Sequence, residues 1–95
     1  MLTKSQINII INAMKPFKPT KIGVFGSVVR NEASQDSDID ILYHFEDTIG
    51  LFKLIGLQQE LQEKLNRKVD LVSEKYLNPK LKPYILKDLK VIYGS

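Results

Sequence analysis

The first apolar pattern along the chain has the spacing of a helix. Its members recur at intervals of three and four positions, and they are Ile7, Ile10, Ile11 and Met14. Thr3 and Gln6 stand in the arrangement of a capping box, in which each side chain bonds the backbone N–H of the other residue. The pattern predicts an amphipathic helix that begins near Thr3 and ends near Pro16.

A longer helical pattern lies in the middle of the chain, over about residues 49–66. A stripe of leucines marks the face expected to turn toward the core, formed by Leu54, Leu57, Leu61 and Leu65. Near the C-terminus, Asn78 and Pro79 have the form of a cap followed by a proline at the first helical position, although Pro83 leaves a later start open. The residues of this last segment expected to pack on a sheet are Leu81, Tyr84, Ile85 and Leu89.

Three short apolar runs predict strands, at about residues 21–25, 38–45 and 68–72. A short helix is expected between the first two strands, over about residues 27–33. The elements then follow in the order helix, strand, helix, strand, helix, strand, helix. We therefore expect a single domain over residues 1–95, of α/β or α+β class, with a small mixed three-stranded sheet flanked by about four helices.

The stretch that carries chemistry begins where the first predicted strand ends. Gly26 and Ser27 stand at the corner where the chain turns from that strand into the short helix. A glycine lets a ligand approach the backbone closely, and the N–H groups at a helix start have no partner within the helix. The Ser27 hydroxyl can bond a phosphate oxygen. This corner is therefore a candidate for binding phosphate groups.

Two aspartates open the second predicted strand. Side chains two apart on a strand point to the same face, so Asp38 and Asp40 should project together while Ile39 enters the core. At about 4 Å and an effective dielectric constant of about 20, two such charges repel by about 4 kcal/mol, which a divalent cation would reverse. Asp70 lies in the third predicted strand, and it would join them if that strand lies beside the second.

Composition narrows the choice of metal and of partner. The chain has no cysteine and one histidine, which excludes disulfides and thiolate sites and leaves magnesium with oxygen ligands open. The net charge is +3, and the lysines are spread along the chain rather than gathered in a nucleic-acid-binding arm. No apolar run approaches the roughly 20 residues of a membrane span, so we expect a cytoplasmic protein that contacts neither membrane nor nucleic acid.

The order of these motifs resembles the DNA polymerase β-like nucleotidyltransferase superfamily, and within it the minimal nucleotidyltransferase (MNT) branch. Gly26-Ser27 is followed after ten residues by Asp38-Ile39-Asp40, and Asp70 stands in the sequence Val-Asp-Leu-Val. Arg30 also fits the GSxxR form of the family, whereas Asn31 stands where a common form has glycine. The resemblance covers nearly the whole chain and implies the palm-like fold of polymerase β.

The resemblance also implies an activity, the magnesium-dependent transfer of AMP from ATP with pyrophosphate leaving. Asp38 and Asp40 would hold two magnesium ions, and Asp70 would complete the catalytic ion and assist deprotonation of the attacking hydroxyl. Gly26 and Ser27 would grip the triphosphate. Two ions about 3.5–4 Å apart can stabilise both the attacking and the leaving oxygen.

A partner is implied as well. Nucleotidyltransferases of this branch are often encoded beside a HEPN-domain protein that resembles an RNase toxin, and some transfer AMP to a tyrosine of that toxin and so block it. The resemblance thus predicts the antitoxin of a toxin–antitoxin pair and leaves a homo- or hetero-oligomer open. A single domain without a substrate-binding domain fits this role, because the partner supplies the acceptor.

Several alternatives stay open at the level of sequence. The same fold can act as a catalytically idle module that neutralises its partner by stoichiometric contact, although three intact, mutually repelling aspartates favour an enzyme. Transfer to a small molecule such as an aminoglycoside resembles larger relatives with an extra domain, and RNA is a further acceptor. Arg30 has two candidate roles, contact with a phosphate of the nucleotide or an ion pair with Asp36.

Overall fold

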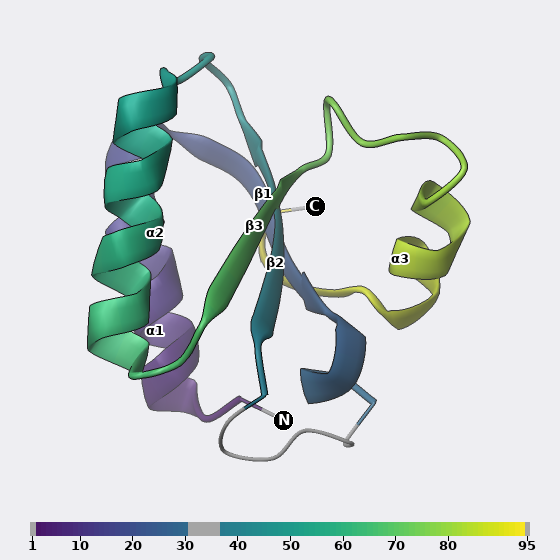
Figure 1. Cartoon of the computed structure of the whole chain (residues 1–95), viewed down its shortest axis with the longest axis horizontal. Helices are drawn as coiled ribbons and strands as arrows, with labels where there is room; N and C mark the ends of the chain where they lie inside the picture. The colour runs from purple at the N-terminus through teal and green to yellow at the C-terminus, as the bar shows by residue number, and fades with distance from the viewer. Residues whose placement is uncertain (1, 31–36, 95) are drawn as a thin grey trace.

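The computed structural model describes residues 2–30 and 37–94. Its elements in chain order are the helix α1 (Lys4–Met14), the 3₁₀ turn η1 (Lys15–Phe17), the strand β1 (Pro19–Phe25), the 3₁₀ turn η2 (Gly26–Val28), the strand β2 (Ile39–Phe45), the helix α2 (Leu51–Leu65), the strand β3 (Val69–Ser73), the helix α3 (Lys82–Asp88) and the strand β4 (Lys90–Gly94) (Figure 1). The predicted capping box is present, because Thr3 Oγ1 accepts from the Gln6 N–H at 3.1 Å and Gln6 Oε1 accepts from the Thr3 N–H at 2.8 Å.

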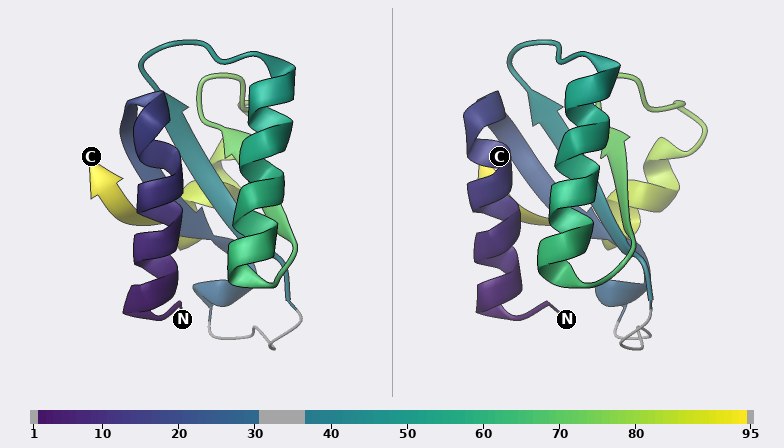
Figure 2. Two further views of the ribbon diagram at one scale, coloured as in Figure 1. Left: turned by 90° about the vertical axis from the view of Figure 1, so that its left-hand side faces the viewer. Right: turned by 60° about the vertical axis from the view of Figure 1, so that its left-hand side comes forward.

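One sheet of four strands runs through the molecule in the order β3-β2-β1-β4. β1 pairs antiparallel with β2 and with β4, whereas β2 and β3 are parallel because α2 returns the chain between them. The helices α1 and α2 lie side by side on one face of the sheet, and α3 lies on its other side (Figures 1 and 2). The sheet is therefore layered on one face and largely open on the other.

The hydrophobic core lies between the sheet and the two helices α1 and α2. It is built from apolar side chains at helical spacing and from alternate strand residues, among them Ile10, Met14, Ile22, Val24, Ile39, Ile41, Leu57, Leu61 and Leu65. Burial of one such side chain contributes about 1.5–3 kcal/mol. The predicted leucine stripe of α2 is confirmed, with Leu54 partly buried at its edge.

The prediction of a three-stranded sheet was wrong, because Lys90–Gly94 forms a fourth strand against β1. This segment is short and largely exposed, so its strand character depends on the free edge of β1 rather than on an apolar run of its own. The helix expected over residues 27–33 begins instead as the 3₁₀ turn Gly26–Val28, and residues 31–33 lie outside the described residues.

The last helix begins at Lys82, the later of the two starts that the sequence left open. Its packing was predicted only in part: Leu81 and Tyr84 are exposed, whereas Ile85 and Leu89 are half-buried. Leu89 lies against Gly23 of β1, where a Cβ atom would stand 2.6 Å from Leu89 Cδ1 and 3.3 Å from the Lys90 carbonyl oxygen.

We expect the substitution Gly23→Ala to lower the free energy of unfolding by about 1–3 kcal/mol, because the new methyl group must displace Leu89 or the paired backbone at Lys90. Urea denaturation measures this change. Gly56→Ala is the matched control, because Gly56 lies within α2 with nothing within 4 Å of its would-be Cβ atom. Alanine at position 56 should stabilise the helix by about 0.5–1 kcal/mol. Equal effects of the two substitutions would contradict the packing of Leu89.

Candidate active site

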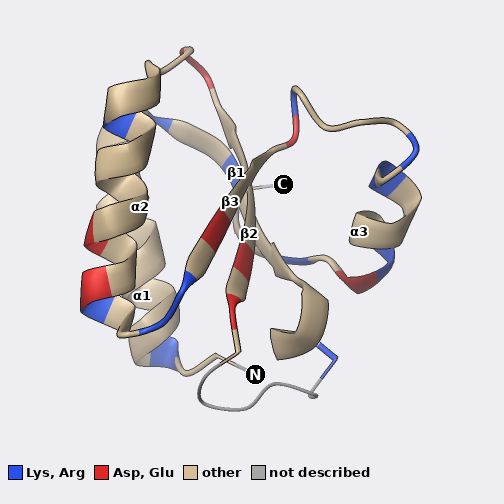
Figure 3. Ribbon diagram, in the orientation of Figure 1, with Lys and Arg blue, Asp and Glu red and all other residues tan. Residues whose placement is uncertain are grey.

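The three predicted aspartates meet at one end of the sheet, where β1 ends and where β2 and β3 begin. Asp40 of β2 lies opposite Phe25, the last residue of β1, on one side and opposite Asp70 of β3 on the other. Figure 3 shows the acidic segments of β2 and β3 beside each other. The condition for Asp70 to join the pair, that its strand lies beside the second, is thus met.

Strand alternation decides which way these carboxylates point. Ile39 and Ile41 are fully buried on the side of α1 and α2, so Asp40 between them projects to the open side of the sheet. Asp40 is half-buried, whereas Asp38 and Asp70 are exposed. Asp38 stands one residue before β2 begins, at the mouth of the site.

The electrostatic state of Asp40 reflects this crowding. Burial, and then the charges of Asp70 and Asp38, raise the pKa of the Asp40 carboxyl above its ordinary value of 3.8, while the charge of Arg30 acts in the opposite direction. The charges of Asp70 and Asp38 therefore disfavour ionisation of Asp40, and a divalent cation would relieve that repulsion.

The carboxylate oxygens of the site suit magnesium, although they supply only part of its coordination shell. Within residues 2–30 and 37–94, no three acidic or histidine side chains are gathered into a cluster that could hold a metal by themselves. Magnesium suits such a site, because it keeps several waters and is commonly bound by one or two carboxylates together with substrate phosphates. The donors present thus match a metal that arrives with a phosphorylated ligand.

Gly26 brings the turn after β1 against Asp40. Its φ of +79° lies in the left-handed region, and a Cβ atom at this position would collide with Asp40 Oδ2. Ser27, which is half-buried, follows Gly26 in this 3₁₀ turn. A turn of three residues has little macrodipole, so an anion here would depend on backbone N–H groups and the Ser27 hydroxyl.

Arg30 forms an ion pair with Asp88, the last residue of α3, with 2.5 Å between Arg30 Nη1 and Asp88 Oδ2. The sequence did not predict this pair; the pair expected as one of the two roles of Arg30 involves Asp36, which lies outside the described residues. Because the charge of Arg30 also lowers the pKa of Asp40, the guanidinium lies within electrostatic reach of the site.

Arg67 is a residue of the site that the sequence did not reveal. Its Nε and Nη2 atoms donate to the Ser37 carbonyl oxygen at 3.0 and 2.7 Å, and the Ile39 N–H donates to the Lys68 carbonyl oxygen at 2.9 Å. The turn between α2 and β3 thus holds the backbone on both sides of Asp38. The contact joins residues 30 positions apart, and no local pattern signals it.

We expect Arg67→Met to lower the free energy of unfolding by about 1–3 kcal/mol, because a half-buried carbonyl loses two charged donors while the aliphatic stem is retained. Urea denaturation measures the change. Lys68→Met in the same turn is the control, because Lys68 is exposed and its backbone bond to Ile39 survives. The control should change stability by less than about 0.5 kcal/mol, and an equal loss in both variants would contradict the role of Arg67.

The raised pKa of Asp40 predicts how the stability of the metal-free protein depends on pH. The folded state binds this proton more tightly than the unfolded chain, so the penalty of ionising Asp40 is complete above the raised pKa and is relieved as the pH falls through it. In EDTA, the stability difference between Asp40→Asn and the wild type should therefore be larger at about pH 7 than at about pH 4, near the ordinary pKa of the carboxyl. Urea denaturation of both proteins at the two pH values measures it. A difference that does not change with pH would contradict the prediction.

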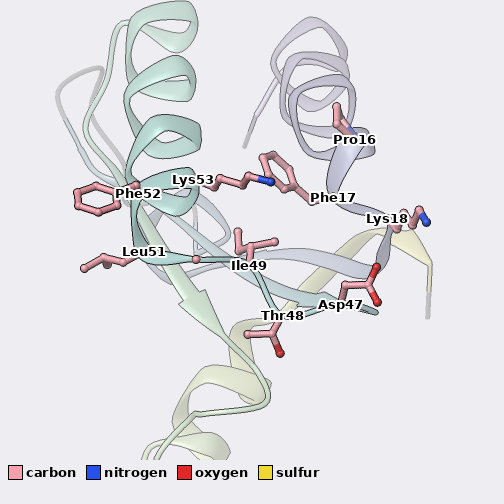
Figure 4. A pocket seen from close by; sticks show the side chains of 10 residues that line it. Pro16, Phe17, Lys18, Asp47, Thr48, Ile49, Leu51, Phe52 and Lys53 are labelled. Carbon is pink, nitrogen blue, oxygen red and sulfur yellow. The ribbon is translucent and has the colours of Figure 1, made fainter.

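A hollow in the described surface lies at the other end of the sheet. It has a volume of about 550 Å³ and is lined by the turn η1 and by residues 47–53. Figure 4 shows the side chains of Phe17 and Lys53 extending toward each other across it, while Phe52 points away. Because β2 runs from the aspartates at its start to this loop after its end, the hollow is separate from the candidate site.

No helix in the described part of the chain is long and apolar enough to cross a membrane.

The chain is similar in sequence to known proteins. A family model described as polymerase beta, nucleotidyltransferase, matches residues 7–95. Protein adenylyltransferase MntA of Thermococcus cleftensis is 40% identical over 94 residues, covering 94% of this chain and 95% of that protein.

Solved structures agree with this match. A toxin–antitoxin complex with AMP-PNP superposes with a TM-score of 0.84 at 28% identity, covering 94% of this chain and 73% of the other. A tri-AMPylated HEPN toxin of Shewanella oneidensis in complex with an MNT antitoxin gives a TM-score of 0.79 at 26% identity, covering 99% of this chain and 74% of the other.

Proposed function

The chain belongs to the polymerase beta family of nucleotidyltransferases, and on that premise we propose that it is a protein adenylyltransferase that moves AMP from ATP to a hydroxyl group of a partner protein. The observation that carries the proposal is the register of β2 and β3, which sets Asp40 opposite Asp70 on the open side of the sheet, beside the Gly26 turn. Residues 1–95 act as one domain in this proposal.

Each residue of the site has a role that follows from its position. Asp38 and Asp40, at the mouth and at the centre, hold magnesium together with phosphate oxygens of ATP. When bound, two magnesium ions neutralise charge on the attacking and the leaving oxygen. Gly26 and Ser27 bind the triphosphate through backbone and hydroxyl groups, and the absence of a side chain at Gly26 lets it approach Asp40.

Asp70, on the adjacent strand, accepts the proton of the acceptor hydroxyl. The acceptor oxygen bonds to the α-phosphorus of ATP, the bond from that phosphorus to the bridging oxygen breaks, and pyrophosphate leaves.

The acceptor in this proposal is a tyrosine hydroxyl of a HEPN-type RNase toxin, which makes the chain an antitoxin. Support comes from the AMPylated HEPN toxin in complex with an MNT antitoxin and from the toxin–antitoxin complex with AMP-PNP, because each complex contains a chain with the fold of this one. The exposed position of Asp70 beside Asp40 suits an acceptor that is itself a protein.

The test is the intact mass of a HEPN-domain protein encoded beside this chain, after co-expression with either the wild type or the variant Asp38→Ala, Asp40→Ala. One or more added AMP units with the wild type, and none with the variant, would support transfer at this site. If the partner gains no mass yet stays bound and neutralised with both proteins, the chain acts by stoichiometric contact and the proposed transfer is wrong.

A further inference from the structure

The route by which a protein acceptor reaches the aspartates is set by the layers of the fold. The helices α1 and α2 cover one face of the sheet, and Asp40 projects from the other. The face of Asp40 also carries Leu42, whose partner Gly23 contacts Leu89 just after α3. An acceptor that reaches Asp40 and Asp70 must therefore approach from the side of the molecule on which α3 lies (Figure 1).

The helix α3 buries little of itself. None of its residues is fully buried, and a helix of seven residues is too short to be stable without packing. Residues 75–88, the segment that contains α3, are held in place at their C-terminal end by the Arg30–Asp88 ion pair and by the contact of Leu89 with Gly23. The exposed apolar side chains of this segment are Tyr76, Leu81, Tyr84 (75% exposed) and Leu86. Such a set on one short segment is typical of an interaction surface.

The same segment is basic. Lys75, Lys80, Lys82 and Lys87 are all exposed. Asp88, the one acidic residue within residues 75–88, pairs with Arg30, and Glu74 just before them pairs with Lys21 at 2.8 Å. Figure 3 shows the basic segments on and around α3, on the far side of the sheet from α1 and α2. The charge that complements this surface is negative.

We propose that residues 75–88, called here the α3 surface, form the docking surface for the acceptor protein, and that this protein presents an acidic rim around an apolar patch beside its acceptor hydroxyl. The inference rests on the proposed function and adds to it the location and the chemistry of the contact. The Arg30–Asp88 pair connects the surface to the site, because Arg30 acts on Asp40 and Asp88 ends α3.

The experiment uses purified wild-type chain and its HEPN-domain partner, with two variants of the α3 surface. These are Leu81→Ser, Tyr84→Ser and the charge reversal Lys80→Glu, Lys82→Glu. Phe52→Ser is the matched control, because Phe52 is 89% exposed on α2, which covers the opposite face of the sheet.

Each α3 variant should raise KM and Kd for the partner at least about tenfold, while kcat and the Kd for AMP-PNP change less than about threefold. The control should change neither KM nor Kd for the partner. The charge reversal should also flatten the salt dependence of binding.

Results that place the contact elsewhere, or that assign the surface to a second copy of the chain, overturn the inference. KM and Kd that stay unchanged in the α3 variants, or that rise equally in Phe52→Ser, would place the contact elsewhere. A dimer of the chain alone that Tyr84→Ser dissociates would assign the surface to a second copy. If the wild type transfers no AMP, the proposed function fails, and the Kd values still decide whether the partner docks on the α3 surface.

Discussion

Asparagine in place of Asp40 should lower the rate of AMP transfer by at least about a thousandfold, equivalent to about 4 kcal/mol of transition-state stabilisation. Asp40 lies between Asp38 and Asp70 and is the one carboxylate of the three that the fold half-buries, so its charge is central to any metal held there. Initial rates at saturating ATP and partner measure the loss.

The matched control is Asp47→Asn, the same chemical change in the exposed loop after β2, at the other end of the sheet. It should leave the rate within about twofold of the wild type. Asp40→Asn should retain the fold, because asparagine has nearly the shape of aspartate. Transfer by Asp40→Asn at a rate near that of the wild type would remove Asp40 from the site.

The second large effect is expected from Gly26→Ala. The backbone at this position has a φ of +79°, which costs an alanine about 1–2 kcal/mol, and the new methyl group would collide with Asp40 Oδ2. Because a displacement of about 1 Å at a reacting group costs about a hundredfold in rate, we expect a loss of that size together with lower stability. Transfer kinetics and urea denaturation measure the two effects.

Two comparisons separate the collision from a general loss of folding. Gly50→Ala changes a glycine with nothing within 4 Å of its would-be Cβ atom and an ordinary φ of −72°, so it should affect the rate little. In the Asp40→Asn background, Gly26→Ala should cost little further rate, because the two changes act on one group. Full additivity of the two losses would contradict action through Asp40.

Local sequence patterns were sufficient to predict the elements that form the core. Residues only a few positions apart specify each of these features: the capping box at Thr3 and Gln6, the leucine stripe of α2 and the alternation around Asp40. The boundaries of the strands were correct to within about two residues for the same reason. The geometry of the aspartates followed from alternation, with the single condition that β2 and β3 are neighbours.

Contacts between segments that are distant in the sequence could not be predicted from local patterns. The strand β4 exists because β1 has a free edge, and α3 leaves Leu81 and Tyr84 exposed although their spacing predicted packing. Arg67 reaches Ser37, and Arg30 reaches Asp88, across 30 and 58 positions of sequence. Such pairings depend on where whole elements come to lie, which no window of neighbouring residues contains.

The sequence by itself determined the order of the elements as far as α3, the family and the identity of the acidic residues, because periodicity and motif spacing are local properties of the chain. The tertiary structure decided that Asp70 stands opposite Asp40, that Gly26 approaches Asp40 closely, and that α3 lies on the same side of the sheet as these carboxylates. The physical reason is that strand register and layer packing minimise exposed apolar surface and unpaired backbone groups over the whole molecule, and these terms exist only once the segments have met.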